Sequence, residues 1–124
     1  MERINYHNKR FKAISNSENG EVDSETFFHY RQGGDVIWAT YYGTNIRMGT
    51  ITGIVKEDSS LEFTYQHVNI NNEIMTGKCT STPEKQSDGS LIMKETWEWT
   101  CKDFSKGTSE IAELVEKENL VRLF

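Results

Sequence analysis

Apolar and polar residues alternate along most of this chain, most regularly between about residues 46 and 100, where β-branched and aromatic side chains occupy every second position. A period of two is typical of β-strands that have one buried and one solvated face. Residues that favour turns, mainly Gly, Asn, Asp and Ser, interrupt the alternation about every twelve residues, a spacing typical of barrels and sandwiches. The pattern predicts eight strands, at 9–16, 25–32, 35–42, 46–56, 60–69, 73–82, 90–100 and 106–115.

The turns also predict how neighbouring strands pair. Three-residue hairpin loops usually end in a residue of left-handed conformation, often Gly, Asn or Asp, and we interpret 43–45, 57–59, 70–72 and 87–89 as such loops. The resulting register gives one face that is almost entirely apolar and aromatic and an opposite face of Thr, Lys, Gln and Glu. The apolar face carries Ile37, Ala39, Tyr41, Arg47, Gly49, Ile51, Gly53, Val55, Leu61, Phe63, Tyr65, His67, Met75, Gly77, Cys79, Leu91, Met93, Glu95, Trp97 and Trp99.

Small residues on the apolar face repeatedly oppose large ones, with Gly53 beside Phe63 and Gly77 between Tyr65 and Trp99. Alternation of small and large side chains is how a small barrel fills its interior. We therefore predict an all-β fold, a single closed antiparallel up-and-down barrel of about eight strands that resembles the lipocalins.

The whole chain, 1–124, is expected to form one domain, with the barrel over 8–115 and a tail over 116–124. The last segment, 109–124, fits either a short strand or a helix, because Ile111, Leu114 and Val115 also form a helical stripe. The apolar end of the tail would either close the barrel edge or dock on another subunit, so a homodimer is left open.

Composition narrows the classes of partner and site. The net charge of −5 argues against nucleic acid or an anionic membrane as the main partner, because both require a basic surface. The polar first ten residues predict no export signal, and two cysteines then favour a reduced, cytoplasmic setting. The three histidines are too dispersed in sequence to predict a metal site, and no motif predicts a cofactor.

Glu95 is the least expected residue on the apolar face. A carboxylate inside a barrel must be paired, hydrogen-bonded or protonated, since burying an isolated charge costs several kcal/mol. Glu95 is therefore either a ligand anchor or proton acceptor with a raised pKa, or a structural partner of Arg47 or Ser81, or a residue at a solvated barrel mouth.

Other polar residues on this face also allow two interpretations. His67 faces Gly49, which leaves room either for a ligand or only for the imidazole ring. Arg47 near Tyr41 could bind a carboxylate with two hydrogen bonds or lie at the rim. Cys79 has apolar flanks, which raise the pKa of a thiol and make it unreactive.

Three functions follow from these residues. The first is a barrel that binds a small molecule in an aromatic-lined lumen. The second is an enzyme in which Glu95 and His67 act as an acid–base pair. The third is a protein-interaction module with a filled core, which would use Trp38 and Tyr42 on the outer face and the C-terminal tail. For the first function, the predicted ligand-binding residues are Tyr41, Arg47, Tyr65, His67, Glu95, Trp97 and Trp99.

Several motifs also carry a resemblance: the stretch 11–22, Phe28-His29-Tyr30, Tyr65-Gln66-His67, Met75 to Cys79, and Glu95 to Trp99. Over about residues 8–115 the chain is similar to a family of small bacterial proteins that carry the label N-acetylglutamate synthase. The resemblance implies a lipocalin-like or avidin-like (calycin) barrel and, through the label, acetyl transfer. Acetyltransferases commonly hold the pyrophosphate of acetyl-CoA on a glycine-containing loop at a helix N-terminus. The only comparable segment here, 31–34, is expected to be a hairpin turn.

Overall fold

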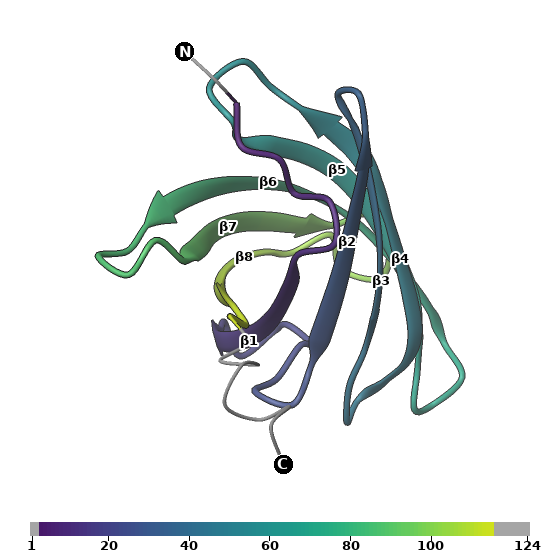
Figure 1. Ribbon diagram of the computed structural model, residues 1–124. Helices are drawn as coiled ribbons and strands as arrows, with labels where there is room; N and C mark the ends of the chain where they lie inside the picture. Colours follow the sequence, from purple (N-terminus) through teal and green to yellow (C-terminus); the bar gives the residue numbers. More distant parts are fainter. Residues whose placement is uncertain (1–2, 116–124) are drawn as a thin grey trace.

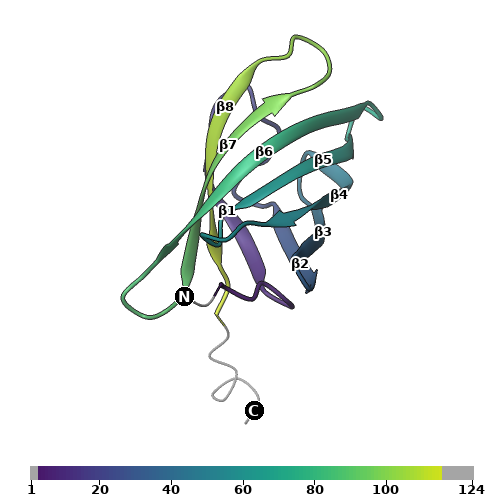
Figure 2. The same cartoon turned by 90° about the horizontal axis from the view of Figure 1, so that it is seen from above.

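The computed structural model describes residues 3–115, which form eight antiparallel strands. Each strand pairs with the next along the chain, and the last pairs with the first, so the sheet closes on itself (Figures 1 and 2). The predicted fold, a closed up-and-down barrel, is confirmed. Within the described residues no helix has the length and apolar character needed to cross a bilayer. The strands are β1 (Arg10–Asn16), β2 (Phe27–Gly33), β3 (Val36–Tyr42), β4 (Ile46–Val55), β5 (Leu61–Asn69), β6 (Ile74–Lys85), β7 (Leu91–Trp99) and β8 (Lys106–Glu113).

The predicted register is confirmed from the middle of β4 to β7, where Gly49 pairs with His67, Tyr65 with Gly77, and Ser81 with Glu95. Three of the four predicted loops carry the left-handed residue at their third position. These residues are Ser59, Asn72 and Gly89, with φ angles of 74°, 61° and 88°.

The predicted inward position of Arg47 is wrong. In the β3–β4 hairpin the backbone of Gly43 bonds that of Ile46 in both directions, at 3.0 and 3.3 Å, so two residues form the turn instead of three. A β-bulge between Ile46 and Met48 then inserts an extra residue. Tyr41 consequently pairs with Gly49 instead of Arg47. Ile46 is buried in the core, and Arg47 is exposed outside the barrel.

The sequence allowed either a strand or a helix over 109–124. The structure shows a strand as far as Glu113. Its backbone pairs with β7 on one side and with β1 on the other. The predicted tail, 116–124, lies outside the described residues.

A segment before β1 seals one end of the barrel. Residues 3–9 cross the end at which β4 meets β5 (Figure 1). Tyr6 is fully buried there, and its hydroxyl donates to the backbone oxygen of Ser59 at 2.5 Å. Its backbone N–H donates to Gln32 Oε1 at 2.8 Å. The sequence pattern predicted no role for this segment in the barrel, yet it closes the lumen at this end.

The outer face carries two aromatic side chains where the register predicted them. Trp38 and Tyr42 on β3 are exposed by 42% and 60%, and Tyr42 lies beside Phe27 with ring centroids 5.9 Å apart. Whether they form a contact surface for another protein stays a prediction.

Gly77 allows a direct test of which face is inward. A Cβ atom at this position would lie 2.1 Å from Cζ of Tyr65, so the aromatic ring would have to move. Gly77→Val is expected to lower the free energy of unfolding by about 1–3 kcal/mol, because overpacking forces side chains out of their rotamers. Thr76→Val, on the neighbouring outward position, is expected to change it by less than about 0.5 kcal/mol. Chemical denaturation measures both, and equal losses would contradict the assignment of faces.

Candidate functional site

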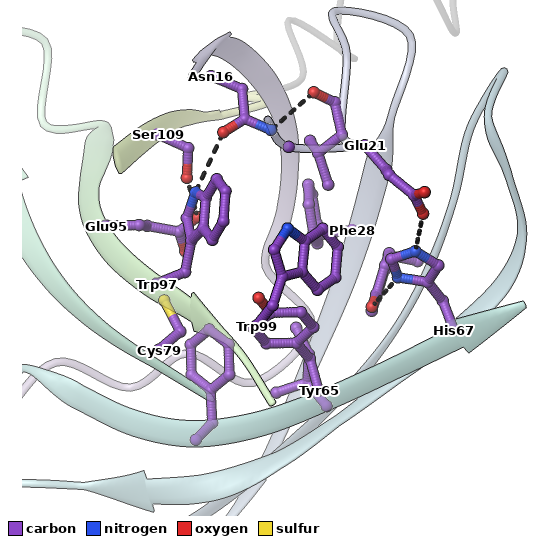
Figure 3. Close-up of a pocket in the computed structure, with 15 residues that line it drawn as sticks. Asn16, Glu21, Phe28, Tyr65, His67, Cys79, Glu95, Trp97, Trp99 and Ser109 are labelled. Carbon is purple, nitrogen blue, oxygen red and sulfur yellow. Dashed lines mark hydrogen bonds and ion pairs between the residues drawn. The ribbon is translucent and has the colours of Figure 1, made fainter. Parts of the chain in front are cut away.

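A cavity of about 50 Å³ lies inside the barrel, against the connection between β1 and β2 (Figure 3). Every predicted site residue except Arg47 lines it. Its walls come from several strands and from one connecting segment, and they combine aromatic rings with a few polar side chains, the usual composition of a small-molecule site. The lining residues are Asn16, Gly20, Glu21, Val22, Phe28, Tyr41, Ile51, Phe63, Tyr65, His67, Cys79, Glu95, Trp97, Trp99 and Ser109.

The connection between β1 and β2, residues 17–26, covers the cavity, and we call it the mouth segment. It is fixed to three parts of the barrel. Its Ser17 N–H donates to the backbone oxygen of Thr108 on β8 at 3.0 Å. The indole N–H of Trp99 donates to the backbone oxygen of Asn19 at 3.0 Å. The side chain of Asn45, in the β3–β4 turn, donates to Asp23 at 3.3 Å. The segment therefore forms part of the wall of the site.

Glu21 of the mouth segment ends a chain of hydrogen bonds that begins at Tyr41. The hydroxyl of Tyr41 lies 2.8 Å from Nδ1 of His67, and Nε2 of His67 lies 2.8 Å from Oε1 of Glu21. Oε2 of Glu21 accepts a bond from Asn69 at 3.1 Å. An ionised carboxylate can only accept, so Nε2 carries the ring proton and Nδ1 accepts from Tyr41.

Burial lowers the pKa of His67, and the hydrogen bond and negative charge of Glu21 oppose that shift only in part. The imidazole is therefore neutral at pH 7, and its contact with Glu21 is a hydrogen bond between a neutral donor and a carboxylate. Burial also raises the pKa of Tyr41, so the phenol keeps its proton. This chain is well suited to hold the mouth segment closed over the cavity.

Glu95 lies at the middle of β7 and is only 9% exposed. Its two oxygens accept hydrogen bonds from Ser109 on β8 at 3.0 Å and from Ser81 on β6 at 3.1 Å. Burial raises the pKa of Glu95 to about 7, although both serine hydroxyls act to lower it. Of the partners considered for Glu95, Ser81 is present and Arg47 is not. Within the part of the chain that the structure describes, no positively charged side chain is hydrogen-bonded to Glu95 in the lumen.

Trp97 and Trp99 form the aromatic centre of the site, with ring centroids 5.5 Å apart at an angle of 62°. Both indole N–H groups are used by the wall: Trp97 donates to the side chain of Asn16 at 3.1 Å, and Trp99 donates to the mouth segment. Phe28 stacks on Tyr41 at 5.3 Å. The surface that these rings offer to a ligand is thus largely their apolar π-system.

Glu95 and His67 do not form an acid–base pair in this structure. Figure 3 shows them on opposite sides of the cavity, with Trp97 and Trp99 between them in the view. Among residues 3–115 no side chain hydrogen-bonds to both, since the serines bind Glu95 while Tyr41 and Glu21 bind His67. Glu95 and His67 therefore belong to two separate hydrogen-bond networks, and of the two only Glu95 keeps capacity to accept further hydrogen bonds.

The two cysteines are free thiols. Cys79 lines the cavity, and burial, followed by the nearby charge of Glu95, raises its pKa well above the usual value. A thiol in this environment stays protonated at pH 7 and is a poor nucleophile. Across residues 3–115, no group of three or more His, Cys, Asp or Glu side chains is placed to hold a metal ion.

The sequence pattern missed Glu21, Asn16 and Ser109 as lining residues. The register was proposed for strand faces from β3 to β7, so neither the mouth segment nor β8 was assigned to the lumen. The length of the β1–β2 connection could have indicated that it takes part in the site. This connection has ten residues, whereas the other connections between strands have two to six. Longer loops at a barrel end commonly cover a site.

Removing the carboxylate of Glu21 is expected to loosen the mouth segment. Two hydrogen bonds to a charged group would be lost, so we expect amide exchange within 17–26 to become about 10–100 times faster in Glu21→Ala. The N–H groups of Gly20 and Thr26, which bond backbone oxygens inside the segment, are suitable reporters. Glu18→Ala, at an exposed position of the same segment, is the matched control. Unchanged exchange in Glu21→Ala would contradict the anchoring role.

The comparison with known families agrees with this geometry. A model of the avidin-like protein family matches residues 4–114, which covers the barrel together with its sealing segment and mouth segment. No curated protein and no solved structure matches the chain significantly. These findings give no support to the label N-acetylglutamate synthase.

Proposed function

Because this chain belongs to the avidin-like protein family, we propose that it binds a small molecule in the lumen of its barrel. The observation that carries this proposal is the cavity beneath the mouth segment. An eight-stranded barrel has an interior just wide enough to be filled by side chains or to hold one small ligand. Here the side chains leave a cavity of about 50 Å³ between aromatic rings and two buried polar groups.

The size of the cavity sets the size of the bound group. About 10–15 Å³ of such space holds one water molecule, so the cavity has room for roughly four groups of that size. A larger ligand would have to leave part of itself outside or displace the mouth segment. The aromatic rings would contact the apolar part of the ligand, while Glu95 would orient its polar atoms, since both ring nitrogens of His67 are already bonded to Tyr41 and Glu21.

Two observations support this function over the alternatives. An interaction module with a filled core needs no cavity bordered by a buried carboxyl group. An enzyme that uses Glu95 and His67 together needs each group within hydrogen-bond reach of a proton that it transfers, whereas both ring nitrogens of His67 are bonded to Tyr41 and Glu21.

Native mass spectrometry of the protein purified from its own host tests the proposal without knowledge of the ligand. We expect a co-purifying small molecule that is released on denaturation. Cys79→Leu adds volume to the cavity wall without touching a polar group, so it should abolish that signal. Thr80→Leu, on the outward face of the same strand, should retain it. Equal retention in both variants would place the ligand outside the lumen.

A further inference from the structure

The charges around the cavity all point to one kind of ligand. Among residues 3–115, no lysine or arginine lines the cavity, while two carboxyl groups, Glu21 and Glu95, do. Glu21 is already bonded to His67 and Asn69. Glu95 has only the hydroxyls of Ser81 and Ser109. An ionised carboxylate at the position of Glu95 is thus neutralised by no side chain that lines the cavity.

Glu95 has unused capacity to accept hydrogen bonds. A carboxylate offers about four acceptor positions on its two oxygens, and one hydroxyl bonds each oxygen here. About two positions are left, one on each oxygen. A planar group with two parallel N–H bonds, such as a guanidinium or an amidinium, has the geometry to use both.

The aromatic rings fit the same ligand. Trp97 lies beside Glu95, and Trp99 contacts both Trp97 and His67 (Figure 3). Both rings line the cavity, and a cation placed over an indole face is attracted by about 0.5–2 kcal/mol. A neutral ligand would gain contact with the rings but would leave the charge on Glu95 uncompensated.

On the basis of the proposed function, we propose that the group bound beside Glu95 is a compact organic cation of the guanidinium or amidinium type, held by the Glu95 carboxylate and the faces of Trp97 and Trp99. The charge of Glu95 contributes to the raised pKa values of four nearby groups, Tyr30, Tyr41, Tyr65 and Cys79. All four have raised pKa values and are neutral at pH 7. None of them can replace the cation.

Two probes of nearly equal size and shape distinguish the effect of ligand charge on binding from the effect of ligand shape. Methylguanidinium is cationic, and N-methylurea is neutral. The readout is the set of indole N–H signals in an NMR titration at millimolar probe concentration. Trp97 and Trp99 report on the cavity, and the exposed Trp38 reports on binding elsewhere. At pH 8.5 we expect methylguanidinium to shift the signals of Trp97 and Trp99 and to bind at least about tenfold more tightly than N-methylurea, which corresponds to one charge-assisted bond.

Protonation of Glu95 should compete with the cation. Since the pKa of Glu95 is about 7, the affinity for methylguanidinium should fall roughly 30-fold between pH 8.5 and pH 5.5, as the ionised fraction falls. In Glu95→Gln both the preference for the cation and its pH dependence should disappear. Glu98→Gln, which changes an outward-facing carboxylate three residues further along β7, should retain both.

Equal or tighter binding of N-methylurea would overturn the cation proposal and leave small-molecule binding in the lumen intact. Shifts of Trp38 alone, or no binding of either probe, would also overturn it. The proposed function itself fails if no small molecule co-purifies with the protein, or if Cys79→Leu retains that molecule as well as Thr80→Leu does. The two failures are therefore distinguishable.

Discussion

Glu95→Gln is expected to raise the free energy of unfolding of the ligand-free protein by up to about 3 kcal/mol at pH 8.5. The pKa of Glu95 is about 7 in the folded protein, against 4.5 as its ordinary value, and each pKa unit is worth about 1.4 kcal/mol. The folded state thus favours the protonated carboxyl group. Glutamine is neutral at every pH and can both accept from and donate to the serine hydroxyls.

Because the pKa of Glu95 is raised in the folded protein, the stability difference between the wild type and Glu95→Gln depends on pH. A raised folded-state pKa contributes stability that is fully present below pH 4.5 and is lost as the pH rises through 7. The wild type and Glu95→Gln should therefore be nearly equally stable at pH 4.5 and should diverge up to about pH 8. Chemical denaturation of both proteins at pH 4.5, 6 and 8.5 measures the difference, with Glu98→Gln as the control for a partly exposed carboxylate on the same strand. A variant that is less stable at every pH would instead make Glu95 a structural residue.

Trp97→Ala should cost about 3–5 kcal/mol, the usual range for removing a large aromatic side chain from a core. Trp97 is 7% exposed, contacts Trp99, and its ring lies where any side chain at position 107 would have to go. Trp38→Ala, on the outer face at 42% exposure, should cost less than about 1 kcal/mol. The pair removes the same side chain from the two faces of one sheet.

Denaturant midpoints of the two tryptophan variants provide the measurement, and similar losses would mean that the lumen is not the core of the protein. A second result is expected from Trp97→Ala if it still folds. Its cavity should be larger than that of the wild type, because cores collapse only partly around a deleted ring. An apolar probe such as benzene should then raise its melting temperature, as ligands do when they bind only the folded state.

The alternation of apolar and polar residues was sufficient to predict the fold. Its reliability came from β5, β6 and β7, where each strand alternates without interruption and each connecting loop ends in a residue of left-handed conformation, such as Asn72 or Gly89. A shift by one residue would have moved Glu62 or Lys78 into the lumen, so the register was strongly determined there.

The register was not determined at the β3–β4 hairpin. Gly43-Thr44-Asn45 is compatible with loops of two or three residues, and the bulge after Ile46 leaves no clear mark in the sequence. Bulges depend on how a strand bends within the finished barrel, which is a property of the whole sheet. Arg47 was assigned to the lumen for this reason, and the site consequently lacks the cation that the sequence placed in it.

The site was predictable where it lies on strands and unpredictable where it lies on connections. Tyr41, Tyr65, His67 and Trp97 follow from strand periodicity alone. Glu21 does not, because a loop residue has no periodicity and its contact with His67 spans 46 positions of the chain. The sealing contact of Tyr6 with Ser59, 53 positions away, is of the same kind.

The closure of the barrel between β1 and β8 has a consequence for the order in which the protein assembles. Seven of the eight strand pairings join neighbours along the chain, but the eighth brings together residues such as Lys9 and Glu113, 104 positions apart. Closing a loop of that length costs roughly 2 kcal/mol more than closing a hairpin of about twelve residues, so this seam is expected to form last during folding and to open first. β1 also pairs with β2 over only three residues. Because Asn16 at the end of β1 bonds Trp97, the binding cavity is complete only once the slowest contact of the fold has formed, and a ligand held there would delay the first step of unfolding.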